Sequence, residues 1–64
     1  MKNILLNETK IGEFLTVGVE MEEDEVGLLI ASSDVSAGFA FKFDEWDKFV
    51  EAVNRADARF KDIQ

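Results

Sequence analysis

The sequence predicts an α+β domain, with a four-stranded antiparallel sheet followed by one C-terminal helix. Apolar residues alternate with period two over residues 11–21, 26–31 and 37–43, as is typical of half-buried strands. After Asp44 the apolar residues recur at helical spacing. The chain contains no proline and no linker-like tract, so we expect residues 1–64 to form a single domain.

The first half of the chain is expected to supply two strands and a hairpin. Residues 2–6 form a short apolar strand, and the polar residues 7–10 predict a turn. The second strand, residues 11–21, places Leu15, Val17, Val19 and Met21 on one face and Phe14, Thr16, Gly18 and Glu20 on the other. Residues 22–25 are four adjacent acids, which cannot be packed together and therefore predict a hairpin tip.

The third and fourth strands are joined by a polar loop over residues 32–36. In the third strand Val26, Leu28 and Ile30 share a face. In the fourth strand, Phe39, Phe41 and Phe43 lie on one side and Gly38, Ala40 and Lys42 on the other. The three phenylalanines are expected to supply much of the small core.

The helix is predicted to begin at Asp44, because aspartate is a favourable N-cap residue. Its apolar stripe begins with Trp46, Phe49, Val50 and Val53, which we expect in the core or in a dimer contact. A single helix covers only one face of a four-stranded sheet. The other face must therefore be solvated, paired with another subunit, or used to bind a ligand.

The length of the chain favours self-association. A 64-residue domain buries only about 60% of the surface that its unfolded chain exposes, so its stability is marginal, and domains of this size usually have some further support. The sequence contains neither cysteine nor histidine, so disulfides and ordinary zinc sites are excluded. We therefore expect a homodimer.

Catalysis is not expected. Ser32, Ser33 and Ser36 lie in one loop, but no histidine is present to activate them. The four glycines are scattered and form no phosphate-binding loop, and the acids do not follow the spacing of a calcium loop. The sequence thus predicts a non-enzymatic protein without a metal or cofactor. It shows no signal peptide and no membrane span, which predicts a soluble intracellular protein of the cytoplasm or nucleoid.

One segment carries a family resemblance. Residues 38–49, Gly-Phe-Ala-Phe-Lys-Phe-Asp-Glu-Trp-Asp-Lys-Phe, resemble the last strand and helix start of the single-stranded DNA-binding domain in the positive cofactor 4 family of transcriptional coactivators. The spacing from Gly38 to Trp46 is similar, and residues 53–58 are similar to the family's helix end. The Pur-alpha family shares a similar strand-to-helix pattern and is a second possibility.

The resemblance implies a homodimer that binds single-stranded DNA or RNA and acts in transcription regulation. An aromatic residue and lysines on an open sheet face also suit single-strand binding, through base stacking and phosphate contacts. We expect Phe14 to stack on bases, Lys10 and Lys42 to contact phosphates, and Thr16 to lie on the groove side.

The charge of the chain supports an alternative from another class. Fourteen acids and seven bases give a formal net charge of −7, which opposes binding to phosphates. Acids or neutral residues also stand where the positive cofactor 4 family carries basic residues. The alternative is an acidic protein-interaction module, or a nucleic-acid mimic, that binds a basic protein surface. Its expected contact residues are Glu20, Glu22, Glu23, Asp24 and Glu25.

Overall fold

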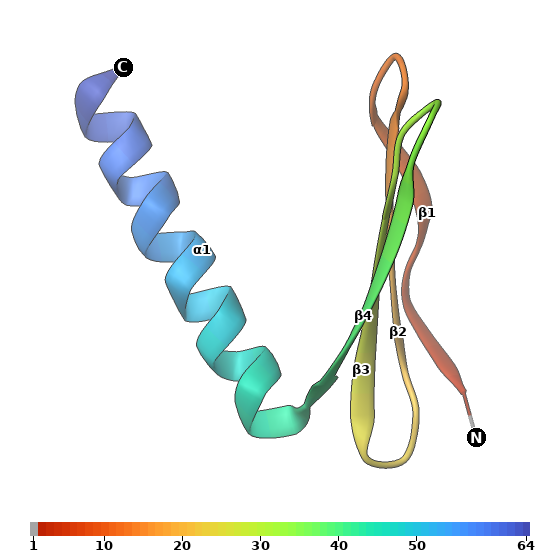
Figure 1. Cartoon of the computed structure of the whole chain (residues 1–64). Coiled ribbons are helices and arrows are strands. Elements are labelled where there is room, and N and C mark those ends of the chain that lie inside the picture. The colour runs from red at the N-terminus through yellow and green to blue at the C-terminus, as the bar shows by residue number, and fades with distance from the viewer. Residues whose placement is uncertain (1) are drawn as a thin grey trace.

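The computed structural model describes residues 2–64 and contains the predicted architecture (Figure 1). The elements are β1 (Asn3–Gly12), β2 (Leu15–Met21), β3 (Glu25–Ala31), β4 (Ser36–Lys42) and α1 (Phe43–Ile63). Each strand pairs antiparallel with its neighbour in the chain, so the sheet order is β1-β2-β3-β4. The fold class predicted from the sequence is confirmed.

The predicted turn over residues 7–10 is wrong, because β1 continues through it. Leu6 is opposite Val19 and Thr9 is opposite Val17, so two residues of β1 face only one residue of β2. This is a β-bulge, and it accommodates the extra polar residues without reversing the chain. The chain reverses instead at residues 13 and 14.

The register of β2, β3 and β4 is regular and separates two faces. We define the helix-side face by the residues that point toward α1, which are Leu15, Val17, Val19, Met21, Val26, Leu28, Ile30, Ala37, Phe39 and Phe41. The outer face carries Thr16, Gly18, Glu20, Gly27, Leu29, Ala31, Gly38, Ala40 and Lys42. Val26 and Leu28 form the core, with 3% and 7% of their surfaces exposed.

The helix begins one residue earlier than predicted, at Phe43. Lys42, and not Asp44, is the N-cap residue. The backbone N–H of Lys42 donates a hydrogen bond to Oε1 of Glu45 at 2.8 Å. This bond caps the N-terminus of the helix. Phe43 therefore belongs to the helix and not to the fourth strand.

The helix contacts the sheet only through its first two turns. The ring of Phe41 lies 5.7 Å from Trp46 and 5.0 Å from Phe49, measured between ring centroids. Beyond this cluster α1 diverges from the sheet (Figure 1). Trp46 and Phe49 are consequently half-buried, whereas Val50 and Val53 are exposed in the single chain.

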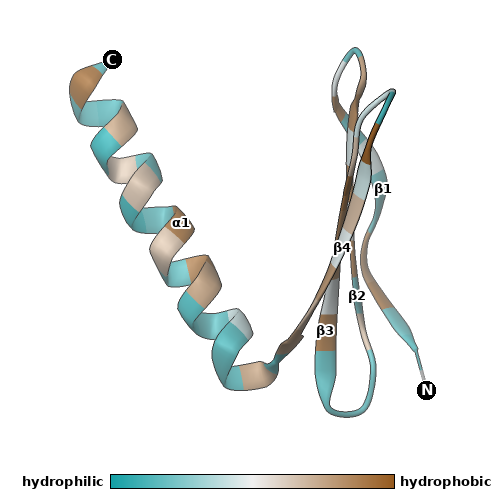
Figure 2. Ribbon diagram, in the orientation of Figure 1, coloured by the Kyte–Doolittle hydropathy of each residue, from teal (hydrophilic) through white to brown (hydrophobic). Residues whose placement is uncertain are grey.

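The predicted phenylalanine core is thus only partly formed within one chain. Phe41 is half-buried beneath the helix, but Phe39 and Phe43 are 52% and 46% exposed. Phe39 is exposed because α1 covers one end of the helix-side face and leaves the rest open, and Phe43 lies in the first turn of α1 itself. Figure 2 shows apolar residues recurring along α1 as far as its C-terminal end, well beyond the part that touches the sheet.

Candidate functional site: the outer face of the sheet

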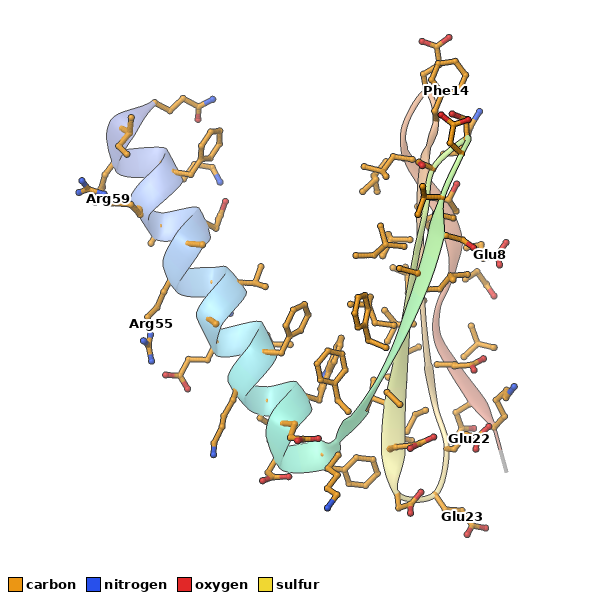
Figure 3. The ribbon with its side chains drawn as sticks, in the orientation of Figure 1. Glu8, Phe14, Glu22, Glu23, Arg55 and Arg59 are labelled. Atoms are coloured by element: carbon orange, nitrogen blue, oxygen red, sulfur yellow. The ribbon has the colours of Figure 1, made fainter. Side chains whose placement is uncertain are left out.

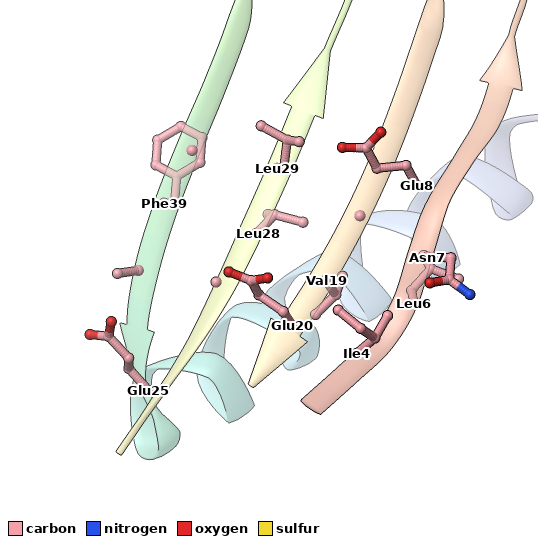
Figure 4. A pocket seen from close by; sticks show the side chains of 14 residues that line it. Ile4, Leu6, Asn7, Glu8, Val19, Glu20, Glu25, Leu28, Leu29 and Phe39 are labelled. Carbon is pink, nitrogen blue, oxygen red and sulfur yellow. The ribbon is translucent and has the colours of Figure 1, made fainter. Parts of the chain in front are cut away.

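Small residues form the centre of the outer face. Gly18, Gly27 and Gly38 lie on the adjacent strands β2, β3 and β4. None of the glycines has a positive φ, so the backbone does not need glycine at these positions. Their effect is on the shape of the surface, since they leave an open groove of about 560 Å³ across the sheet (Figure 4).

Three carboxylates line this groove, and each comes from a different strand. Glu8 lies on β1, Glu20 on β2 and Glu25 on β3. No lysine or arginine is among the lining residues. We call this surface the acidic groove. Its chemistry suits a cationic ligand and opposes an anionic one.

Two of the acids lie directly over the glycines. A Cβ atom added to Gly18 would lie 3.4 Å from Cγ of Glu8, and one added to Gly27 would lie 3.5 Å from Cγ of Glu20. The missing side chains therefore make room for the stems of the two glutamates. The third glycine, Gly38, is more open, because the nearest atom to its added Cβ would be the Leu28 carbonyl oxygen at 4.0 Å.

At one end of the acidic groove, Lys2 forms weak ion pairs with two glutamates. Nζ of Lys2 lies 3.5 Å from Oε1 of Glu20 and 3.8 Å from Oε1 of Glu22. These groups are about half exposed, so water and salt screen their attraction strongly. Glu8 and Glu25 form no ion pair with the other described residues, which leaves both available to a ligand.

The predicted acidic cluster divides into two parts in the structure. Glu20 and Glu25 are strand residues and line the acidic groove. Glu22, Glu23 and Asp24 form the hairpin tip, where the N–H of Glu22 donates to the carbonyl oxygen of Glu25 at 2.8 Å. Figure 3 shows Glu22 and Glu23 at this end of the sheet.

Glu8 is a site residue that the sequence analysis missed. The polar run around it predicted a turn, and a turn residue would not lie on the sheet face. Only the bulged pairing of β1 with β2 places Glu8 beside Gly18.

The residues predicted to bind nucleic acid are only partly brought together. Phe14 lies in the turn between β1 and β2 and is 64% exposed, close to the paired residues Lys10 and Thr16. Lys42 lies at the opposite end of the sheet, across from Glu25. Thr16 is level with Ser36 of β4, and Lys42 lies six residue steps farther along that strand, which corresponds to about 20 Å. The acidic groove lies between the two ends.

Within residues 2–64, no three or more carboxylates, histidines or cysteines are grouped so that they could hold a metal ion. The described helix is not apolar enough to cross a membrane.

Comparison with known proteins identifies no relative: no family model, no curated protein and no solved structure matches this chain. The resemblance to the positive cofactor 4 family therefore stays a prediction.

Proposed function

We propose that this chain is a non-enzymatic interaction module whose acidic groove binds a basic segment of another protein. One observation carries the proposal: three carboxylates from three strands line one groove whose lining includes no lysine or arginine, and Lys2 pairs with only one of them, Glu20. Complementary charge accelerates association with a cationic partner and disfavours anionic ones. A partner rich in lysine or arginine fits this site, including a protein whose own ligand is a nucleic acid.

The shape of the acidic groove supports a polypeptide ligand. The floor extends from β2 to β4, a width of about 10 Å at the usual spacing of strands. This width matches a single polypeptide segment. Gly38 leaves the floor open on β4, so a bound segment could approach the sheet there while its cationic side chains reach Glu8 and Glu25.

Single-stranded nucleic acid is the competing ligand. The exposed Phe14 beside Lys10 and Thr16 supports it, because an aromatic ring and a lysine can hold one nucleotide. A strand that continued from there to Lys42 would bring its phosphates past Glu8, Glu20 and Glu25. This repulsion is the reason that we place the basic protein segment first.

The two ligands can be compared by fluorescence anisotropy. One probe is a labelled peptide of alternating arginine and glycine, and the other is labelled oligothymidine. We expect the peptide to bind more tightly at low ionic strength. The double variant Glu8→Gln/Glu25→Gln should weaken peptide binding about tenfold, since each exposed ion pair contributes up to about 1 kcal/mol.

A matched variant controls for the change in net charge. Asp47→Asn/Asp62→Asn alters the formal charge by the same two units, from −7 to −5, but both residues are exposed on α1 away from the acidic groove. It should change peptide affinity by less than about twofold. Equal effects of the two double variants would show that net charge and not the acidic groove attracts the peptide. Tighter binding of oligothymidine would favour the single-strand hypothesis instead.

A further inference from the structure

The helix-side face of the sheet is largely uncovered in the single chain. Leu15, Ile30 and Phe39 are 38%, 40% and 52% exposed there. On β2, β3 and β4 every residue of this face is apolar, and none is charged. A surface of this kind in water favours burial against another apolar surface.

The second half of α1 presents the matching apolar surface. Val53, Phe60 and Ile63 continue the stripe that begins at Trp46, and they are 50%, 55% and 71% exposed. The stripe keeps its apolar character for the whole length of α1, although only its first two turns have a partner. The side chains in Figure 3 likewise leave this part of the helix separated from the sheet.

The helix is not placed to close onto its own sheet. Strand β4 ends at Lys42 and α1 begins at Phe43, so no linker residue separates them. The ring cluster of Phe41, Trp46 and Phe49 also holds the base of the helix against the sheet. The direction of α1 is therefore determined at its base, and the wedge between helix and sheet remains open.

The exposed surface area of the chain is large enough for a protein–protein interface of typical size. The chain exposes 5245 Å², whereas a compact monomer of 7.2 kDa exposes about 4100 Å². The excess of about 1100 Å² is larger than the ~800 Å² that each partner buries in a typical stable interface. The radius of gyration agrees, since it is 13.2 Å against about 10.7 Å for a compact chain of this length.

We propose that a second copy of this chain fills the wedge, with the second half of each α1 packed on the helix-side face of the other chain. In a dimer with a two-fold axis both apolar surfaces are buried at once, because each chain supplies one helix and one sheet face. The proposed interface contains apolar residues from both surfaces and leaves the acidic groove on the outside. The like charges of the two chains therefore stay mostly away from the contact.

The oligomeric state tests this proposal without reference to the acidic groove. We expect sedimentation equilibrium to give twice the mass of the single chain. Phe60→Asp on the helix and Leu15→Asp on the sheet should each weaken dimerisation about a hundredfold or more, because each charge is buried twice in a symmetric contact. A wild-type monomer at about 100 μM would overturn the proposal, since typical stable dimers are associated well below that concentration.

Two matched variants locate the interface. Ala58→Asp adds the same charge to the opposite side of α1, and Thr16→Asp adds it to the outer face, next to Leu15 in the chain. Both should change the dimer dissociation constant less than about threefold. A dimer that is indifferent to Phe60→Asp and Leu15→Asp would be joined elsewhere, such as at a sheet edge, and would overturn the proposal.

A separate measurement applies where a variant fails to fold. The unfolding midpoint of the wild-type dimer should rise with protein concentration, because folding and association are then linked. A midpoint that is independent of concentration would contradict the proposed dimer.

Discussion

The glycines of the outer face affect the shape of the sheet surface and are not required by the backbone conformation. Gly18, Gly27 and Gly38 all have φ values that other residues adopt readily. The missing side chains of Gly18 and Gly27 make room for two glutamate stems, and that of Gly38 leaves open space. Glycine inside a strand is unfavourable because it loses more conformational entropy on folding than other residues. These positions therefore reduce stability in exchange for an open surface, which is the pattern expected of a binding site.

Two substitutions at Gly38 test its effects on stability and on peptide binding. Gly38→Ala should raise the free energy of unfolding by about 0.5 kcal/mol, because the added Cβ has open space and the unfolded chain loses freedom. The bulkier Gly38→Leu should weaken binding of the arginine–glycine peptide by roughly tenfold, because it fills the floor of the acidic groove. Urea denaturation and peptide anisotropy measure the two effects. Unchanged peptide affinity in Gly38→Leu would mean that the peptide does not bind in the acidic groove.

Among the secondary-structure elements, strands β2 to β4 and the helix α1 were predictable from the sequence, and strand β1 was not. Strands β2 to β4 alternate strictly because one face is apolar, and the stripe of α1 is equally regular. β1 is exposed along its whole length, so no buried face imposes a period on it, and its polar residues are indistinguishable from a turn in the sequence. For the same reason, Glu8 was not predicted to line the acidic groove.

The early start of α1 has a similar local cause. Asp44 is the better N-cap by residue type, but Glu45 accepts the N–H of Lys42 and so extends the helix toward the strand. The divergence of α1 could not be predicted, because the stripe shows which side of the helix is apolar and not how much of it meets the sheet.

The cap of α1 can be tested with two variants. Glu45→Ala removes both the hydrogen-bond acceptor and a charge near the helix N-terminus, so it should lower the free energy of unfolding by about 1 kcal/mol. Asp44→Ala removes only a charge from the same helical turn and should cost about half as much. Chemical denaturation followed by the fluorescence of Trp46, the single tryptophan, measures both. Equal losses would mean that the hydrogen bond from Lys42 contributes nothing.

For the whole molecule, the two proposed contacts should respond to salt in opposite directions. Peptide binding in the acidic groove depends on attraction between opposite charges, so raising the salt from about 20 mM to about 200 mM should weaken it severalfold. Dimerisation joins apolar surfaces of two chains that each carry a formal charge of −7. Screening of their repulsion should therefore strengthen the dimer over the same range. Anisotropy and sedimentation at both salt concentrations measure the two trends, and a parallel response would contradict the separation of the two surfaces.

The two faces of the sheet have a joint consequence for assembly. The helix-side face and the outer face are opposite sides of one layer of four strands. A dimer joined through the helix-side faces would direct its two acidic grooves to opposite exteriors. Such a particle is bivalent, so it can hold two basic segments of one partner with increased avidity when their spacing matches. Where the segments belong to different partners, the same particle acts as a crosslinker between them.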